Sequence, residues 1–228
     1  SKLRLNPEKI VIIPNWADID DIFPLKRAQS NLSNALSLLG KFVVQYSGNM
    51  GRTHDLKILS ECARKMQDKQ DIHFLIIGSG AKRRWLEETI ITYQISNMTL
   101  LANRPRDELA DSLNACDVGL ISFVSGMAGI SVPSRMYNIM AAGKPILAVA
   151  DVDSELARVV QEERIGWVVP PGDVDELVTA ILEARTDPIY LAEMGQRARQ
   201  VAETKYSLDQ MIESYDRLIQ GLGDPIGA

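Results

Sequence analysis

The sequence predicts an α/β protein built on a doubly wound, Rossmann-like parallel sheet of about six strands, with helices on both faces and further helices at the C-terminal end. Two observations carry this prediction. Short, continuously apolar runs recur along the chain, and such runs are typical of strands buried on both faces of a parallel sheet. Between them, apolar residues recur at helical spacing, and this alternation of strands and helices is that of a doubly wound fold.

Each expected strand is a short apolar run, and most of the runs end at a turn signal containing glycine or proline. After a first strand over residues 9–14, the runs lie at residues 42–46, 72–77, 98–101, 118–121, 145–149 and 166–169. We therefore divide the chain into three parts. Residues 1–40 hold a first strand and an irregular lead-in segment, residues 41–205 form the Rossmann-like domain, and residues 206–228 form a C-terminal helix and tail.

The expected helices separate consecutive strands, which is why the strands are expected to be parallel. After the strand at residues 42–46, Leu56, Leu59, Cys62 and Met66 recur at helical spacing. Further helices are expected up to about residue 93, up to about residue 115, and at residues 154–161, 175–185, 189–204 and 208–219, with one helical turn near residues 31–38.

A loop and short helix over residues 126–145 carry the most specific signals in the chain. Ser131, Pro133 and Ser134 stand at the expected start, where a hydroxyl can cap a helix and proline loses no hydrogen bond. Gly143 suits the left-handed position beyond the last turn, and Pro145 ends the helix. A helix N-terminus beneath a flexible loop presents free N–H groups, so this stretch is predicted to bind an anion.

Four loops are expected to meet at the carboxyl ends of the strands, which is where doubly wound sheets bind their ligands. They are residues 47–52, 78–80, 103–104 and 126–134, and three of them contain glycine. Their convergence indicates a site for a nucleotide or a sugar phosphate.

The first of these loops offers both close approach and positive charge. Gly48, Asn49 and Gly51 let the backbone come near a phosphate, although the same residues also suit an ordinary strand–helix turn. Arg52 and His54 follow and can supply charge to a diphosphate. His54 on its own is more typical of a surface residue at a helix start.

The loops after the next two strands suggest a base site rather than a dinucleotide fingerprint. Gly78 and Gly80 begin a G-x-G pattern, but Arg83 stands where the third glycine belongs, which disfavours NAD. Arg104, at the end of a strand, can border a base pocket or lie simply on the surface.

Composition and short motifs disfavour several other functions. The net charge of −5 argues against nucleic acid as the main partner, and no apolar run approaches the roughly 20 residues of a membrane-spanning helix. Cys62 and Cys116 are expected to be buried free thiols, and no CxxC or Cys/His cluster indicates zinc. Asp-x-Asp pairs at residues 18–20 and 151–153 fit turn and capping chemistry better than metal ligation, so no metal site is predicted. Two histidines do not assemble a hydrolytic triad.

With these residues in view, the chain resembles the C-terminal, nucleotide-sugar-binding half of the group 1 glycosyltransferases with the GT-B fold. The likeness runs nearly end to end and is nearest to the branch that adds sugars to lipid-linked O-antigen or exopolysaccharide precursors. It is carried by residues 13–15 with Asp18, by residues 46–52, 74–80 and 115–120, and most specifically by the runs PSRMYNIMAAGKP (residues 133–145) and GWVVPPGD (residues 166–173).

The resemblance implies transfer of a sugar from a UDP- or GDP-linked donor to a glycan or lipid-linked acceptor, with retention at the anomeric carbon and without a metal or other cofactor. It assigns the nucleoside to Gly78, Arg104 and Asn138, and it assigns no catalytic residue to this chain. The helix N-terminus and nearby basic residues would stabilise the diphosphate leaving group. The residues implied for the donor diphosphate and sugar are Ser47, Gly48, Asn49, Gly51, Arg52, His54, Ser131, Val132, Ser134 and Arg135.

Several positions depart from the family pattern. Where the family has two glutamates separated by seven residues, this chain has Ile130 and Asn138. Asn138 can still hydrogen-bond a ribose, whereas Ile130 offers no polar group. Asn49 and His54 replace the usual Arg and Lys of the earlier loop. Ile130 and Asn138 favour an alternative in which the domain is a non-catalytic module, and a GT-B-fold sugar-nucleotide epimerase is a further alternative.

The chain begins at Ser1 without an initiator methionine and is therefore expected to be part of a longer protein. The family's N-terminal domain, which binds the acceptor and closes over the donor, is absent from the sequence. We expect these residues alone to bind a nucleotide weakly and to transfer nothing. The resemblance places the protein in the cytoplasm, and at the inner face of the membrane if the other half attaches there.

Overall fold

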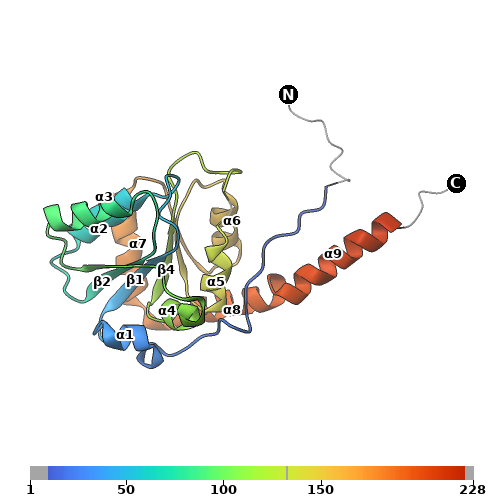
Figure 1. Ribbon diagram of the computed structural model, residues 1–228, viewed down its shortest axis with the longest axis horizontal. Coiled ribbons are helices and arrows are strands. Elements are labelled where there is room, and N and C mark those ends of the chain that lie inside the picture. The colour runs from blue at the N-terminus through green and yellow to red at the C-terminus, as the bar shows by residue number, and fades with distance from the viewer. Residues whose placement is uncertain (1–9, 132, 224–228) are drawn as a thin grey trace.

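The computed structural model describes residues 10–131 and 133–223, and its centre is a six-stranded sheet in the order β3-β2-β1-β4-β5-β6 (Figure 1). Every neighbouring pair of strands is parallel. The strand order reverses between β1 and β4, which confirms the predicted doubly wound, Rossmann-like fold. The strands are β1 (Phe42–Ser47), β2 (Ile72–Ile77), β3 (Met98–Leu101), β4 (Val118–Ser122), β5 (Ile146–Val149) and β6 (Gly166–Val169).

Helices cover both faces of the sheet. Apolar residues of α2, α3 and α7 pack with Val44 of β1 on one face. On the other face, Leu32 of α1 packs with Val43, and apolar residues of α4, α5, α6 and α8 form a further cluster. Neighbouring residues of a strand point to opposite faces, so an all-apolar strand serves both layers. The helices are α1 (Asn31–Ala35), α2 (Leu56–Lys65), α3 (Arg83–Thr92), α4 (Leu109–Leu113), α5 (Arg135–Ala141), α6 (Glu155–Glu162), α7 (Val174–Thr186), α8 (Pro188–Lys205) and α9 (Leu208–Gly223).

The prediction of a first strand over residues 9–14 is wrong for residues 10–14, and residue 9 lies outside the described part of the chain. Residues 10–16 form no strand, and Ile12 is 86% exposed. The first sheet-like contact is an isolated parallel bridge between Ala17 and Ser207, where the Ala17 N–H donates to the Tyr206 carbonyl at 2.6 Å. An apolar run becomes a strand only where neighbouring strands offer it a place, so local preference is not sufficient.

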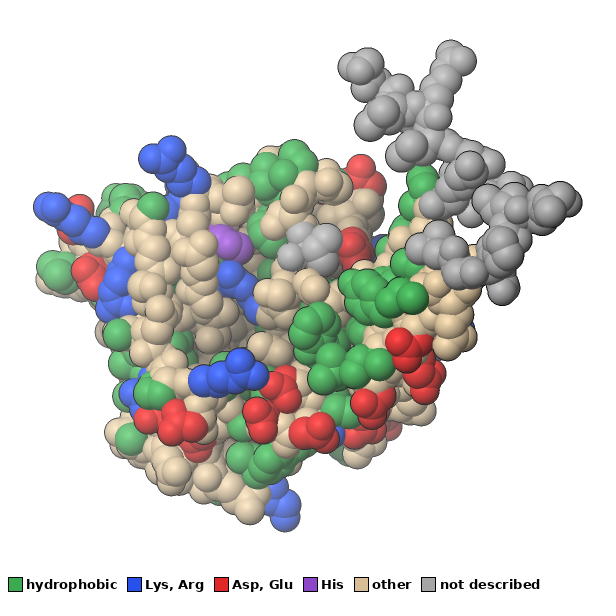
Figure 2. All heavy atoms as spheres, turned by 45° about the vertical axis from the view of Figure 1, so that its right-hand side comes forward, with side chains coloured by type: hydrophobic (Ala, Val, Ile, Leu, Met, Phe, Trp, Pro, Cys, Tyr) green, Lys and Arg blue, Asp and Glu red, His purple; other side chains and the backbone are tan. Residues whose placement is uncertain are grey.

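This segment instead leaves the body of the molecule near helix α9, which projects outwards (Figure 1). Val11, Ile12 and Ile13 line a groove together with Arg217 and Leu218 of α9. Figure 2 shows hydrophobic side chains gathered on the right of the face turned forward, next to a row of acidic ones. Within the described residues, no helix combines the length and the apolar composition needed to cross a bilayer.

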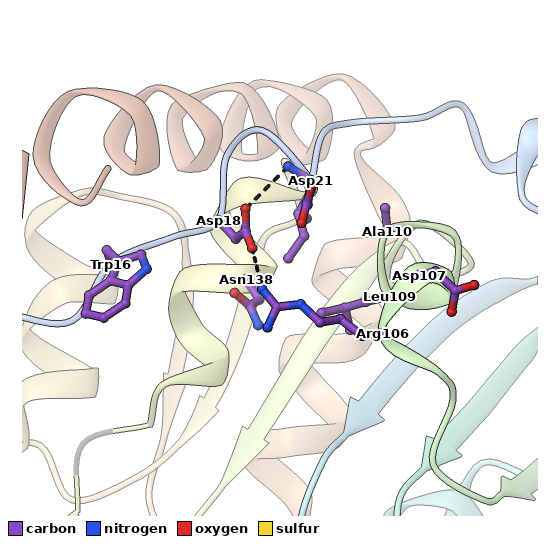
Figure 3. Close-up of a pocket in the computed structure, with 9 residues that line it drawn as sticks. Trp16, Asp18, Asp21, Arg106, Asp107, Leu109, Ala110 and Asn138 are labelled. Carbon is purple, nitrogen blue, oxygen red and sulfur yellow. Dashed lines mark hydrogen bonds and ion pairs between the residues drawn. The ribbon is translucent and has the colours of Figure 1, made fainter. Parts of the chain in front are cut away.

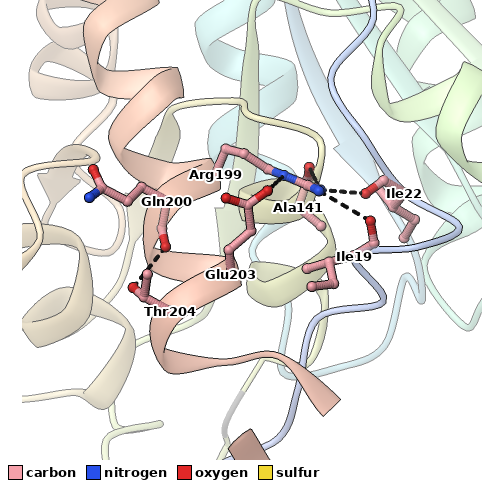
Figure 4. Close-up of polar contacts among 7 residues, drawn as sticks. All are labelled: Ile19, Ile22, Ala141, Arg199, Gln200, Glu203 and Thr204. Carbon is pink, nitrogen blue, oxygen red and sulfur yellow. Dashed lines mark hydrogen bonds and ion pairs between the residues drawn. The ribbon is translucent and has the colours of Figure 1, made fainter. Parts of the chain in front are cut away.

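Arg199 of α8 ties the segment before β1 to helix α5 (Figure 4). Its guanidinium donates to the carbonyl oxygens of Ile22 at 2.7 Å, Ala141 at 2.8 Å and Ile19 at 3.2 Å, and Glu203 pairs with it at 2.6 Å. The last carbonyls of a helix lack partners within the helix, so an arginine here satisfies a group that would otherwise be unpaired. This contact positions residues 19–22 against α5.

His73 of β2 is buried away from the loops. Its side chain is 6% exposed, Nε2 lies 2.9 Å from the Thr99 hydroxyl, and Nδ1 has no hydrogen-bond partner among the described residues. Burial, with a smaller contribution from Lys41, lowers the pKa of His73 to about 4. The unfolded chain, in which a histidine has a pKa of about 6.5, then binds this proton more tightly than the folded chain. The contribution of His73 to stability is therefore complete above about pH 6.5 and is lost as the pH falls towards 4.

We expect His73→Val to remove part of this sensitivity to acid. In the wild type, protonation of His73 should lower the free energy of unfolding by up to about 2 kcal/mol between pH 7 and pH 5. Urea unfolding of both proteins at the two pH values measures this directly, because the values at pH 7 serve as the reference for each protein. The same pH dependence in the variant and the wild type would contradict the burial argument.

Candidate functional site

The loops after β1, β2 and β3 meet at the carboxyl edge of the sheet, as predicted, and hydrogen bonds join them. The Gly48 N–H donates to the Ile77 carbonyl at 2.8 Å, and the Met50 N–H donates to the Ser79 carbonyl at 2.7 Å. The Asn103 amide donates to the Ser79 hydroxyl at 2.8 Å. The strand order reverses here, between β1 and β4, and this reversal point is where doubly wound sheets form their ligand crevice.

Arg135, the first residue of α5, brings the loop after β4 to the loop after β1. Its guanidinium carbon lies 4.7 Å from the centre of the Tyr46 ring, a cation–π distance, and Nη2 donates to the Asn49 carbonyl at 3.3 Å. Within the described part of the chain, Nη1 is buried without a hydrogen-bond partner, and no carboxylate forms an ion pair with this guanidinium. A guanidinium with spare donors and no counter-charge is suited to binding an anion.

Gly48 makes room for this guanidinium. Its φ of +134° is one that side chains rarely adopt, and a Cβ at this position would lie 3.0 Å from the Arg135 guanidinium carbon. A larger residue would strain the backbone and displace the arginine. The sequence predicts that Gly48 lets a phosphate approach the loop. The same glycine also leaves space for the guanidinium of Arg135.

His54 lies beneath Arg135, and it is neutral. Its side chain is 8% exposed and stacks on Phe123, with ring centres 5.1 Å apart. Burial first, and then the positive charge of Arg135, lower the pKa of His54 to about 4. Because burial disfavours the protonated ring, this environment argues against the expectation that His54 supplies charge to a diphosphate. The alternative of a surface histidine is wrong, since the residue is buried.

The start of helix α5 differs from the prediction in one respect. Gly143 has the expected left-handed conformation, with φ of +63°. The predicted hydroxyl cap is not formed, because Ser134 has helical torsion angles and its side chain accepts no capping bond. The turn begins instead at Pro133, whose carbonyl accepts the Met136 N–H at 3.0 Å. Val132, another residue predicted for the diphosphate, lies outside the described residues.

Asp151 holds the glycine-bearing loop after β4. Its carboxylate accepts the N–H groups of Gly126 at 2.8 Å, Met127 at 2.9 Å and Ala128 at 3.3 Å, and the Ser125 hydroxyl at 3.2 Å. Loss of solvation opposes ionisation, but these bonds together hold the pKa of Asp151 below its usual range. The carboxylate is thus engaged in the structure of the loop, which agrees with the turn chemistry expected for it.

The remaining residues predicted for the diphosphate and sugar lie on the same two loops. After β1, Arg52 is exposed, and Ser47 and Gly51 are partly exposed. After β4, Ser131 is partly exposed. All of them are accessible from the carboxyl edge of the sheet, and their contact with a ligand stays a prediction.

A cavity of about 890 Å³ lies between the segment before β1, the turn that precedes α4, and helix α5 (Figure 3). Asn138, a residue predicted for the nucleoside, lines this cavity one turn beyond Arg135. Arg106 also lines it and donates to the Asp18 carboxylate at 3.0 Å. Trp16, which is 47% exposed, forms another part of the wall. The cavity therefore combines an aromatic surface, an amide and an ion pair.

Arg106 and Trp16 are candidate residues that local sequence patterns do not indicate. The ion pair between Arg106 and Asp18 joins positions 88 residues apart, so no local spacing reveals it. The other two residues predicted for the nucleoside have different surroundings: Arg104 forms an ion pair with Glu108, and Gly78 packs against the loop after β1. The only signal in the sequence is the Arg-Pro-Arg run at residues 104–106, in which either arginine follows a strand end.

Comparison with known proteins identifies relatives of this chain. Residues 30–201 match the family described as glycosyl transferases group 1. The chain is 33% identical over 218 residues to the probable glycosyltransferase WbjE of Pseudomonas aeruginosa, covering 95% of this chain and 54% of that protein. It is 28% identical over 217 residues to the putative colanic acid biosynthesis glycosyl transferase WcaI of Escherichia coli K12, covering 94% and 52%. The chain thus spans about half the length of the curated relatives that it matches.

A solved structure extends the comparison to the fold. The structure of Anabaena HepE in complex with UDP superposes on this chain with a TM-score of 0.80 at 17% sequence identity. The match covers 95% of this chain and 58% of that chain. A likeness at this identity shows the fold alone, and the fold matches the C-terminal domains of GT-B glycosyltransferases.

Proposed function

Because this chain belongs to the group 1 glycosyltransferases, we propose that it binds a UDP- or GDP-linked sugar, from which the longer protein transfers the sugar to a glycan or lipid-linked acceptor. The observation that carries the proposal is the position of the Arg135 guanidinium. This guanidinium has no carboxylate partner among the described residues, and it stands at the reversal point of the sheet beside the glycine-bearing loop after β1. A diphosphate is the anion that nucleotide-binding crevices of this kind hold.

In this proposal, the diphosphate, the ribose and the base of the donor are arranged in that order along helix α5. The diphosphate lies at Gly48 and Arg135, the ribose at Asn138, and the base towards the turn at residues 104–106. Arg135 and Asn138 are three residues apart, so they lie on the same side of the helix. The Asn138 amide can both donate to and accept from ribose hydroxyls, and the cavity that it lines, about 890 Å³, has the size of a small-molecule site.

In the transfer step, a hydroxyl oxygen of the acceptor bonds to the anomeric carbon as the bond from that carbon to the β-phosphate oxygen breaks. Negative charge grows on the departing diphosphate, and the hydroxyl proton passes to that diphosphate or to solvent. Arg135 is placed to stabilise this charge through charge-assisted hydrogen bonds, which supports a reaction that needs no divalent metal. Retention at the anomeric carbon is part of the proposal on the strength of the family resemblance.

We place this chain as the donor half of the enzyme, with residues 41–205 as the nucleotide-sugar-binding unit and residues 1–40 and 206–228 flanking it. The greater length of the relatives supports a further half that binds the acceptor. Transfer needs closure of the two halves to exclude water, so this chain alone should bind a nucleotide and show no turnover. Measurable sugar transfer by these residues alone would contradict this division.

Ile130 favours a second candidate function, that of a non-catalytic module. The resemblance places an acidic residue at this position near the transferred sugar, and the side chain here is a 74% exposed isoleucine that offers no hydrogen bond. A module of this kind would bind a nucleotide through the loops after β1 and β4 and would still show no transfer after the acceptor-binding half is added.

Calorimetric titration with UDP, GDP and ADP, with and without magnesium, tests the proposed function. We expect UDP or GDP to bind with a Kd of about 0.1–1 mM, since half of the cleft contributes, and we expect EDTA to leave the affinity unchanged. Binding that appears only with magnesium would contradict metal independence. No heat of binding with any of the three nucleotides at millimolar concentration would contradict the donor site itself.

A further inference from the structure

His54 has no assigned task in the proposed function, and its hydrogen bonds define the state of its ring. Nδ1 lies 3.1 Å from the Ser122 carbonyl oxygen, and Nε2 lies 3.3 Å from Arg135 Nη2. A carbonyl oxygen only accepts and a guanidinium only donates. The ring proton must therefore sit on Nδ1, and Nε2 presents its lone pair to Arg135.

The imidazole is held rigidly in this orientation. Phe123 stacks on it with an angle of 26° between the rings, and the Tyr46 ring meets it edge-on at 6.1 Å. Lys82 Nζ donates to the His54 backbone carbonyl at 2.5 Å. Because the ring is packed on two sides and its backbone is anchored, Nε2 is an acceptor in a defined place.

This acceptor acts on one nitrogen of Arg135. Nη2 is directed to both His54 Nε2 and the Asn49 carbonyl, while the Tyr46 ring lies 4.7 Å from the guanidinium carbon. Nη1 has no partner among the described residues. Neutral acceptors orient a guanidinium without cancelling its charge, whereas a carboxylate in the same place would neutralise it.

We propose that His54 is a positioning residue for donor binding: as a neutral acceptor it fixes one edge of Arg135, so that the free donors of the guanidinium face the diphosphate. His54 itself does not touch the diphosphate. The inference rests on the proposed function, because it takes a nucleoside diphosphate as the ligand of Arg135. It also gives the loop after β1 a role, since Asn49 and His54 of this loop supply the acceptors that orient the charge of Arg135.

Two substitutions of His54 form a matched pair for testing this role. Asparagine places its amide near Nδ1 and keeps the contact with the Ser122 carbonyl, whereas glutamine places its amide near Nε2 and keeps an acceptor for Arg135. Both remove the ring, so the loss of packing on Phe123 is shared. In titrations with UDP and GDP, His54→Asn should weaken binding about tenfold, and His54→Gln should stay within about threefold of the wild type. Equal losses in the two variants would overturn the inference.

Nitrogen NMR of the wild-type imidazole provides a second readout, because it reports whether the proton on His54 moves when a nucleotide binds. We expect the signals of the neutral Nδ1–H form in the free protein and in the presence of saturating UDP or GDP. An Nε2–H form or an imidazolium in the nucleotide complex would overturn the inference, since His54 would then donate to the ligand directly. If the wild type binds neither nucleotide, the proposed function fails, and this inference fails with it. Failure confined to the His54 measurements leaves the proposed function intact.

Discussion

Replacing Arg135 with alanine is expected to weaken binding of UDP or GDP by at least about 100-fold. The substitution removes the guanidinium at the meeting point of the loops after β1 and β4. With it go the two charge-assisted hydrogen bonds that we propose it makes to the diphosphate, of about 1.5 kcal/mol or more each. From a wild-type Kd of about 0.1–1 mM, a loss of this size leaves no measurable heat in a titration at millimolar nucleotide.

Two further variants separate the geometry of Arg135 from its charge. Arg84 on α3 is a matched control, because its side chain is 89% exposed and paired with Glu88, and Arg84→Ala changes the net charge by the same amount. We expect Arg84→Ala to bind as the wild type does. Arg135→Lys keeps the charge without the planar fork and should lose about tenfold. Binding by Arg135→Ala within about threefold of the wild type would remove Arg135 from the site.

Replacing Gly78 with alanine is expected to lower the free energy of unfolding by about 3 kcal/mol or more. A Cβ at Gly78 would lie 2.0 Å from the Gly48 carbonyl oxygen, and the residue has a φ of +152°. The obstacle is backbone, not the end of a flexible side chain, so the loops after β1 and β2 would have to separate. Urea unfolding at pH 7 measures the loss, and nucleotide binding should weaken in parallel because these loops form the crevice.

Gly172 is the matched control for this substitution. Its φ of +81° is also one that favours glycine, but no atom lies within 4 Å of a Cβ at this position. Gly172→Ala should therefore cost only the backbone strain, about 1 kcal/mol. Equal losses at the two positions would show that the close approach of Gly78 to Gly48 does not limit stability.

The elements of the Rossmann-like domain are predictable because their signals are local. The apolar run of β2 and the left-handed Gly143 beyond α5 each depend on a few consecutive residues, and both occur as predicted. The meeting of the loops after β1, β2 and β3 also follows from sequence, since the carboxyl ends of parallel strands lie along one edge of a sheet.

Two local predictions are wrong, each for its own reason. The apolar run at residues 10–14 has the composition of a strand and forms none, because strand formation requires a neighbouring edge with which to pair. Ser134 has the chemistry of a helix cap and does not act as one, because the turn begins at Pro133. The apolar run lacks a partner strand that only the assembled fold can supply, whereas the cap depends on which residue begins the helical turn.

The sequence by itself determined the layered architecture, the edge of the sheet that carries the ligand loops, and the family, because strand, turn and helix signals act over a few residues. Only the tertiary structure decided the charge of His54 and the orientation of Arg135. It also brought Arg106 and Asp18 together as an ion pair in the cavity that Asn138 lines. His54 and Arg135 are 81 residues apart, and Asp18 and Arg106 are 88 residues apart. The free energies of these groups depend on burial and on the charges nearby, and both are settled only when distant segments of the chain are brought together.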